Sequence, residues 1–97
     1  MLFTATTTPQ RLPRVLRCPT MLLIQVKTAG TVALTREQGS AQGATNGNGD
    51  GIEFTNANTT GAAQPQNVWW QGDVWYVSVG GGSIPFVLEL LGEEGVS

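Results

Sequence analysis

The sequence contains no histidine, and this absence excludes the commonest arrangements of a catalytic or metal site. Serine and cysteine nucleophiles usually need an imidazole base, and every metal site with an imidazole ligand is excluded as well. The single cysteine, Cys18, permits neither an intramolecular disulfide nor a thiolate cluster, and we expect it to be a small buried residue. The sequence therefore predicts that the protein is not an enzyme and uses no cofactor.

Charged residues are also scarce, at 12% of the chain, which is about half their usual share. Glycine, in contrast, is nearly twice as frequent as in an average protein, at 13 of 97 residues. A surface with few charges is poorly soluble on its own and suits a chain that packs against other chains. The alternative is an ordinary isolated β-domain whose surface is covered by Thr and Asn.

Long apolar runs are missing as well. The longest, residues 21–24, is far too short to span a bilayer, and the first residues lack the basic and apolar regions of a signal peptide. Three arginines near the N-terminus form only a small basic patch, and the net charge of −2 at pH 7 opposes binding to nucleic acid. We therefore expect no membrane and no nucleic acid among the partners.

What the chain does have is a series of short β-strand patterns separated by turn signals. Prolines in the first 20 residues exclude a helix interior there, and no other segment shows helical periodicity. The predicted fold is therefore all-β: a small jelly-roll-like antiparallel β-sandwich with an extended N-terminal arm. The single domain, residues 1–97, divides into a Pro- and Thr-rich arm or edge strand at 1–20, a hairpin at 21–35, a glycine-rich loop at 37–51 and a closing strand pair at 68–91.

Charge is segregated along the sequence, because all five basic residues lie in the first 36 positions and all seven acidic residues follow. A basic N-terminal arm could dock head-to-tail on an acidic neighbour. Alternatively, the first and last strands are neighbours in one sheet, and the charges offset each other within the monomer. On the first interpretation, the candidate interface residues of the arm are Pro9, Arg11, Leu12, Arg14 and Arg17.

Two strands joined by the glycine hinge 80–82 are predicted to close the domain. In the second of these strands, Phe86, Leu88 and Leu90 share one face because side chains alternate along a strand. In the first strand, Trp75 and Tyr76 point to opposite faces, so we expect one of them in the core and the other facing solvent or a partner.

Trp69 and Trp70 are adjacent, so on a strand at least one of them faces away from the core. An exposed tryptophan here is a candidate interface anchor, and both residues are therefore assigned to the predicted interface. The alternative is a sugar-stacking platform formed by Trp69, Trp70 and Tyr76.

The acidic residues do not form a convincing site. Residues 46–51 resemble the first half of a calcium-binding loop, but Ala57 stands where the bidentate glutamate is needed. The carboxylates that remain for acid–base chemistry are not brought together by their spacing. We therefore assign no catalytic residue and no metal ligand; the carboxylates considered are Asp50, Glu53, Asp73 and Glu89.

Five segments carry a resemblance to a known class of proteins: TTTPQRLP at 6–13, LLIQV at 22–26, GTV at 30–32, DVWYVS at 73–78 and VLEL at 87–90. With these segments the sequence resembles the small β-structured accessory proteins of tailed-bacteriophage virions, of the capsid decoration (cement) class or the related head-fibre type. It departs from them at Lys27, where an Asn is usual, and in the long glycine-rich insertion at 39–51.

The resemblance implies a jelly-roll sandwich without catalytic activity. It implies a capsid decoration protein, made in the host cytoplasm and located on the capsid surface of the virion. Such a protein binds between subunits of the major capsid protein, stabilises the mature head and associates with itself as a trimer or dimer. The alternatives are a structural module of the tail, the neck or a head-fibre base, and a carbohydrate-binding β-sandwich.

Overall fold

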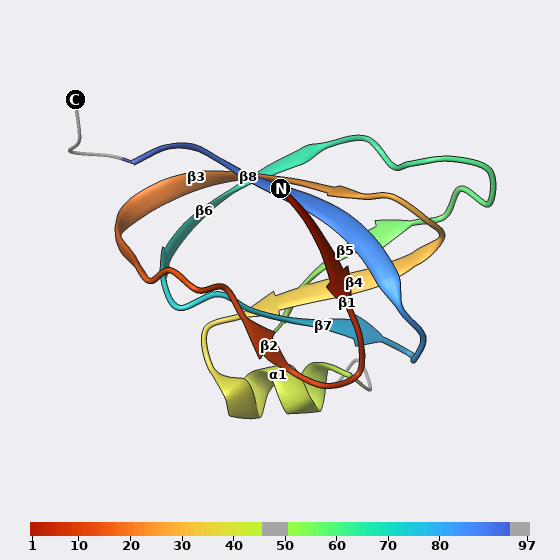
Figure 1. The fold of residues 1–97 in the computed structure, drawn as a ribbon, viewed down its shortest axis with the longest axis horizontal. Coiled ribbons are helices and arrows are strands. Elements are labelled where there is room, and N and C mark those ends of the chain that lie inside the picture. The colour runs from red at the N-terminus through yellow and green to blue at the C-terminus, as the bar shows by residue number, and fades with distance from the viewer. Residues whose placement is uncertain (46–50, 94–97) are drawn as a thin grey trace.

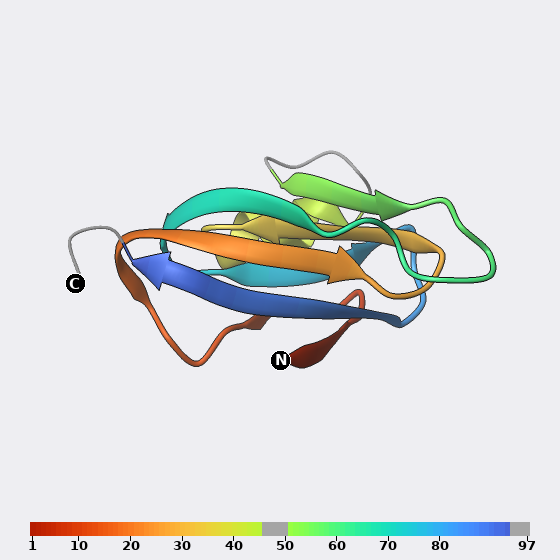
Figure 2. The same cartoon turned by 90° about the horizontal axis from the view of Figure 1, so that it is seen from above.

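A computed structural model describes residues 1–45 and 51–93 as two four-stranded antiparallel sheets that pack against each other (Figures 1 and 2). Sheet 1 consists, in spatial order, of β1 (Leu2–Ala5), β8 (Ile84–Glu93), β3 (Leu16–Val26) and β6 (Gln66–Gly72). Sheet 2 consists of β2 (Gln10–Arg11), β7 (Trp75–Val79), β4 (Gly30–Thr35) and β5 (Ile52–Asn56). The predicted all-β antiparallel sandwich is confirmed.

The strand pairing is that of one long hairpin rolled up on itself. β1 pairs with β8, β2 with β7, β3 with β6 and β4 with β5, all antiparallel, so the β4–β5 connection is the tip of the hairpin. Rolling this hairpin brings β8 beside β3 and β7 beside β4, which completes the two sheets. Strands that follow each other in the sequence therefore lie mostly in different sheets.

The hairpin predicted at 21–35 is wrong for this reason. Both of its strands exist, but β3 belongs to sheet 1 and β4 to sheet 2, so they face each other across the core. The chain crosses between the sheets at Gly30, whose φ of 146° is a conformation that residues with a side chain rarely adopt. A Cβ atom at this position would lie 2.5 Å from Cδ1 of Ile84.

The closing strand pair predicted at 68–91 is three strands, and they alternate between the sheets. β6 and β8 lie in sheet 1, whereas β7 lies between them in sequence but belongs to sheet 2. The hinge residues 80–82 all have positive φ and carry the chain from β7 back to sheet 1. Phe86 and Leu88 of the predicted apolar face of β8 are buried, whereas Leu90 is exposed.

Residues 1–20 contain two edge strands, β1 and β2, and the beginning of β3, so the expected extended arm is not observed. The alternative of an edge strand accounts for this segment. Ala5, Leu12 and Leu16 are buried in the core. This proline-rich segment therefore contributes to the core of the domain.

The glycine-rich segment 37–51 is not only loop, because it contains the helix α1 (Gln38–Ala44). Ala41 and Ala44 are buried against Ala33 and Val77 on the outer side of sheet 2. Small residues three positions apart share one helix face, and close packing on the sheet stabilises a helix that has no side-chain hydrogen bond at its N-cap. The calcium-loop-like segment 46–51 lies outside the described residues except for Gly51.

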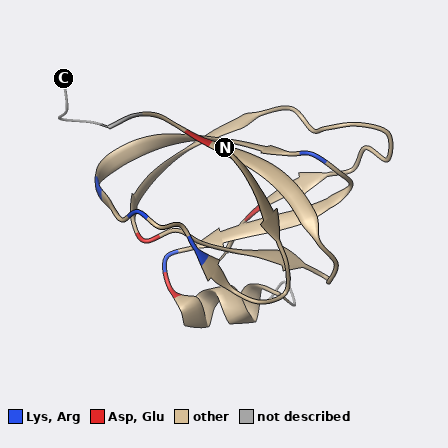
Figure 3. Cartoon of the chain, in the orientation of Figure 1, with Lys and Arg blue, Asp and Glu red and all other residues tan. Residues whose placement is uncertain are grey.

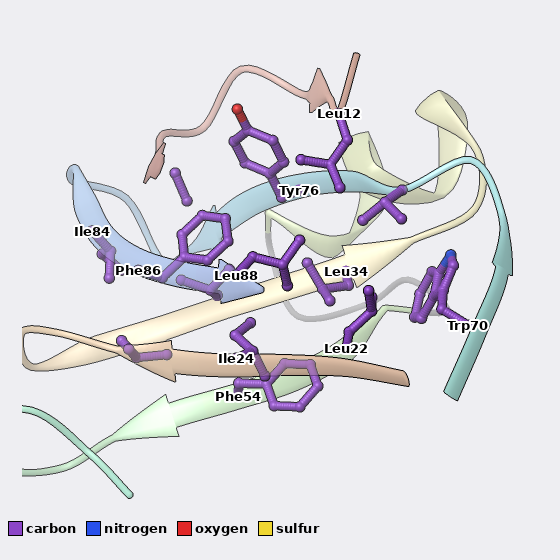
Figure 4. Close-up of a cluster of buried hydrophobic side chains, with 14 of the residues drawn as sticks. Leu12, Leu22, Ile24, Leu34, Phe54, Trp70, Tyr76, Ile84, Phe86 and Leu88 are labelled. Carbon is purple, nitrogen blue, oxygen red and sulfur yellow. The ribbon is translucent and has the colours of Figure 1, made fainter. Parts of the chain in front are cut away.

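The main core fills the space between the two sheets, and both contribute side chains to it (Figure 4). Tyr76 and Phe86, from opposite sheets, contact each other with ring centroids 5.2 Å apart in an edge-on arrangement. Phe3 packs against both rings, with centroid distances of 5.6 and 5.7 Å. The largest contributions to the core come from Leu16, Leu22, Ile24, Leu34, Trp70 and Phe86.

Candidate interaction surfaces

The outer face of sheet 1 carries several exposed or half-buried apolar side chains, and Glu89 of β8 lies among them opposite Leu23. Alternate residues of β3 point into the core, namely Thr20, Leu22, Ile24 and Val26, so the residues between them point outward. Met21 lies opposite Trp69 of β6, and Val87 of β8 lies opposite Leu2 of β1. We call this surface the outer apolar face and define it by Leu2, Met21, Leu23, Trp69 and Val87.

Sheet 2 has its own cover, whereas sheet 1 has none in the described residues. The helix α1 lies over Ala33 and Val77 on the outer side of sheet 2 (Figure 1). On the outer apolar face, Leu2 and Trp69 are 63% and 55% exposed. The solvent side of an antiparallel sheet is normally polar, so an uncovered side with apolar residues is a candidate interaction surface.

Trp69 is exposed, whereas the adjacent Trp70 is buried. Trp70 is 2% exposed, donates a hydrogen bond from Nε1 to the carbonyl of Asp73 at 2.9 Å, and lies beneath the guanidinium of Arg36 at 4.7 Å. Trp69 points outward on the next position of β6. Trp70 is therefore a core residue and is wrong as a predicted interface anchor, whereas Trp69 has the exposure that such an anchor needs.

The sugar-stacking platform is not formed. Tyr76 is buried in the main core beside Phe86, and its hydroxyl donates to Oε1 of Gln10 at 3.0 Å. Because Trp70 is buried as well, Trp69 alone presents an aromatic surface among the three residues considered.

A second candidate surface lies at the end of the sandwich where β6 turns into β7, and several arginines gather around it (Figure 3). Arg11 lies over the ring of Trp75 at 5.9 Å and 4.0 Å from the carboxylate of Asp73. Arg36 donates to the carbonyl of Gln71 at 3.2 Å. The side-chain amide of Gln71 in turn donates to the carbonyl of Arg17 at 3.1 Å.

The charge segregation along the sequence is partly offset within the monomer. The first and last strands, β1 and β8, are paired in sheet 1, as the second interpretation of the charge pattern expects. Arg11 and Asp73, from the basic and the acidic parts of the chain, also approach each other.

The interface residues predicted in the first 20 positions divide by burial. Leu12 is a core residue, buried between the two sheets, so it is wrong as a surface contact. Pro9 is half-buried in the connection between β1 and β2. Arg11, Arg14 and Arg17 are exposed, and with Trp69 they remain predicted contacts.

Asp50 lies outside the described residues, and the other three candidate carboxylates lie on different parts of the fold. Glu53 is on β5 of sheet 2, Asp73 is in the β6–β7 turn, and Glu89 is on β8 of sheet 1. In residues 1–45 and 51–93 there is no group of three or more Cys, Asp or Glu side chains that could hold a metal ion. A surface hollow of about 230 Å³ beside Trp70 and α1 is lined by Arg36 and Glu37 but by none of these carboxylates.

Two further sequence expectations concern Cys18 and membrane helices. Cys18 is half-buried rather than fully buried, and it has no disulfide partner in this single-cysteine chain. Over the described part of the chain, no helix has the length and apolar character needed to cross a bilayer.

Comparison with known protein-family models, curated proteins and solved structures gives no match to this chain. The candidate functional features of the chain are therefore its two surfaces: an uncovered sheet face with apolar residues and an exposed tryptophan, and a cluster of arginines at one end of the sandwich.

Proposed function

We propose that this chain is a non-enzymatic structural protein of a bacteriophage virion, namely a capsid decoration (cement) protein that binds between subunits of the major capsid protein. The observation that carries the proposal is the outer apolar face of sheet 1, which has no cover in the described residues while sheet 2 is covered by α1. A protein of this kind needs a docking surface and no reactive centre.

The mechanism is burial of the outer apolar face against the capsid. Each square ångström of apolar surface removed from water contributes about 25 cal/mol, and a buried tryptophan at the centre of a contact is the kind of residue that dominates binding energy. If the matching surface exists only on the expanded capsid, binding stabilises that state and not its precursor by linkage. The decoration protein thus strengthens the mature head.

The order of the strands supports a jelly-roll fold, which the resemblance to virion accessory proteins implies. Eight strands in the orders β1-β8-β3-β6 and β2-β7-β4-β5 are what rolling a single long hairpin produces. Jelly rolls occur in viral capsid proteins and in lectins alike, so the fold alone does not choose between these roles.

The arginine cluster is the second proposed contact. Arg11, Arg14 and Arg17 are exposed and lie near the β6–β7 turn, where they suit an acidic surface on a neighbouring subunit. The partners are therefore the major capsid protein and further copies of this chain, as a dimer or trimer, on the capsid surface. Neither a nucleic acid nor a membrane is part of the proposal.

A tail, neck or head-fibre base protein would use the same fold and the same apolar face, and it differs in its place on the virion. The carbohydrate-binding alternative is less favoured, because Trp70 and Tyr76 are buried and leave Trp69 without its stacking partners.

Co-sedimentation with capsids tests the proposal directly. Purified protein is mixed with expanded and with unexpanded capsids of the phage that encodes it, and bound protein is measured after pelleting. Met21→Lys places a charge opposite Trp69 on the outer apolar face and should weaken binding to expanded capsids by about 10-fold or more. Ile52→Lys is the matched control, because Ile52 is exposed on β5 of sheet 2 and belongs to neither proposed contact.

Two results would contradict the proposal. One is a protein that fails to pellet with expanded capsids while it binds glycans on an array, which would favour the carbohydrate-binding role. The other is a copy number per virion far below that of the major capsid protein, measured by quantitative mass spectrometry, which would place the chain in the neck or tail.

A further inference from the structure

The four edges of the two sheets are not equally protected. Proteins block edge strands by keeping them short or by placing charges and prolines on them, because an open edge pairs with other strands. β1 has four residues, β2 has two including Arg11, and β5 carries the exposed Glu53. β6 is the longest of the four, with seven residues, and its sequence QNVWWQG contains neither a charge nor a proline.

We infer that β6 is the site at which a second copy of this chain binds, by antiparallel pairing of β6 with β6 across a two-fold axis. This inference rests on the self-association in the proposed function and not on the capsid. Two identical strands related by a two-fold axis perpendicular to the sheet are antiparallel, so the two copies form one continuous eight-stranded sheet.

The register follows from the centre of the strand. Trp69 is the middle residue of β6, so a symmetric pair places Trp69 opposite Trp69 of the second copy on the outer face. Asn67 then lies opposite Gln71 on the same face, and Val68 lies opposite Trp70 on the core side. Directly opposed aromatic side chains stabilise antiparallel pairs, and here they sit at the two-fold axis.

The absence of charge favours a second copy over an unrelated strand. In an isologous contact, a charged residue near the two-fold axis lies close to the same residue of the second copy. Like charges directly opposite each other are destabilising. β6 has no charge to repel itself, and its outward side chains are Asn67, Trp69 and Gln71. Trp69 is 55% exposed in the monomer, so pairing removes part of its apolar surface from water.

One existing contact lies at the end of the strand. Arg36 donates a hydrogen bond to the carbonyl of Gln71 at 3.2 Å. This exposed hydrogen bond must break or rearrange when the residues at the ends of the two β6 strands pair. The pairing also doubles the outer apolar face. Sheet 1 of one copy continues into sheet 1 of the other, so their outer sides form one surface centred on the two copies of Trp69.

Sedimentation velocity over a range of protein concentrations measures the association. The wild-type chain should show a concentration-dependent dimer, and Trp69→Lys should weaken it at least about 10-fold while the far-ultraviolet circular dichroism of the fold is retained. Leu2→Lys, at the opposite edge of the same sheet, is the matched control and should leave the dimer intact. A dimer weakened by Leu2→Lys and not by Trp69→Lys would overturn the inference, as would a wild-type chain that stays monomeric.

Disulfide trapping tests the register. In a Cys18→Ser background, Trp69→Cys should cross-link with itself, because opposed Cα atoms in an antiparallel pair are about 4.5–5.5 Å apart, within disulfide range. Asn67→Cys should not cross-link with itself, since the two copies of residue 67 are about 13 Å apart along the strand. It should cross-link when mixed with Gln71→Cys. Self-cross-linking of Asn67→Cys would contradict the register.

The two proposals fail separately. A chain that dimerises through β6 but does not pellet with capsids contradicts the proposed function and leaves the dimer standing. A chain that pellets with capsids but is monomeric and does not cross-link at residue 69 contradicts the dimer alone.

Discussion

Tyr76 shows how a single residue joins the two sheets. Its ring contacts Phe3 and Phe86 of sheet 1, while its hydroxyl donates to Gln10 on the neighbouring strand β2. Burial raises the pKa of this hydroxyl above the ordinary value of 10.0, because the charged phenolate is poorly solvated there. The polar group is therefore kept neutral and hydrogen-bonded at the edge of an apolar cluster.

The raised pKa predicts a loss of stability at alkaline pH. Above about pH 10 the unfolded chain ionises its tyrosine while the folded chain still holds the proton, so the free energy of unfolding falls as pH rises; below pH 10 both states are protonated and this contribution is constant. Since Tyr76 is the only tyrosine, an absorbance titration reads it alone. The native protein should titrate above 10.0 and the denatured protein near it, and a native midpoint at or below 10.0 would contradict the burial argument.

At the scale of elements, α1 is a helix whose residues have a low intrinsic helix propensity. Its sequence QGSAQGA contains two glycines, which disfavour helix, and it lacks an N-cap hydrogen bond. Packing of Ala41 and Ala44 on sheet 2 compensates, because a larger side chain would hold the helix away from Ala33 and Val77. The helix thus depends on the sheet that it covers.

Two glycine-to-alanine substitutions should have opposite effects. Gly39→Ala places a methyl group in open space on α1 and should raise the free energy of unfolding by about 0.5 kcal/mol. Gly30→Ala should lower it by about 1–3 kcal/mol, because of the positive φ and the contact with Ile84. Urea denaturation followed by tryptophan fluorescence measures both. If the two substitutions changed stability in the same direction, either the helix or the sheet crossing would be assigned wrongly.

At the scale of the molecule, the rolled hairpin makes the two ends of the chain interdependent. β1 forms the edge of sheet 1 beside the late strand β8, and β2 forms the edge of sheet 2 beside β7. Many contacts are therefore between residues far apart in sequence, and a chain of this topology gains little stability until most of it is in place.

Deleting residues 1–12 should consequently destabilise the whole sandwich and not merely weaken a contact with a partner. The deletion removes both edge strands and the buried side chains of Ala5 and Leu12, so we expect a loss of about 3 kcal/mol or more from the 5–15 kcal/mol typical of a domain. Thermal unfolding by circular dichroism measures this. The double substitution Thr7→Ala and Thr8→Ala, in the exposed connection between β1 and β2, is the control and should change stability by at most about 0.5 kcal/mol. An unchanged melting temperature for the deletion would show that residues 1–12 are a dispensable arm.

Much of this architecture could be predicted from local patterns, and the failures have a common cause. Apolar and β-branched runs located β3 and β7, alternation of apolar residues located β4 and β8, and the glycines at 80–82 located a connection. The pairing could not be predicted in the same way, because a strand with one apolar side fits either sheet equally well. For the candidate site, the adjacency of Trp69 and Trp70 established that one is exposed, but only the position of the core decided which.

The sequence by itself determined the all-β class, the single domain and the absence of histidine chemistry, because composition and residue alternation are local properties. Only the tertiary structure decided that the first 12 residues are edge strands, that a helix covers sheet 2, that sheet 1 is left uncovered, and that Trp69 stands at the middle of an unprotected edge. These features depend on which strands meet, and that choice is made by burial of the core as a whole and not by any one segment.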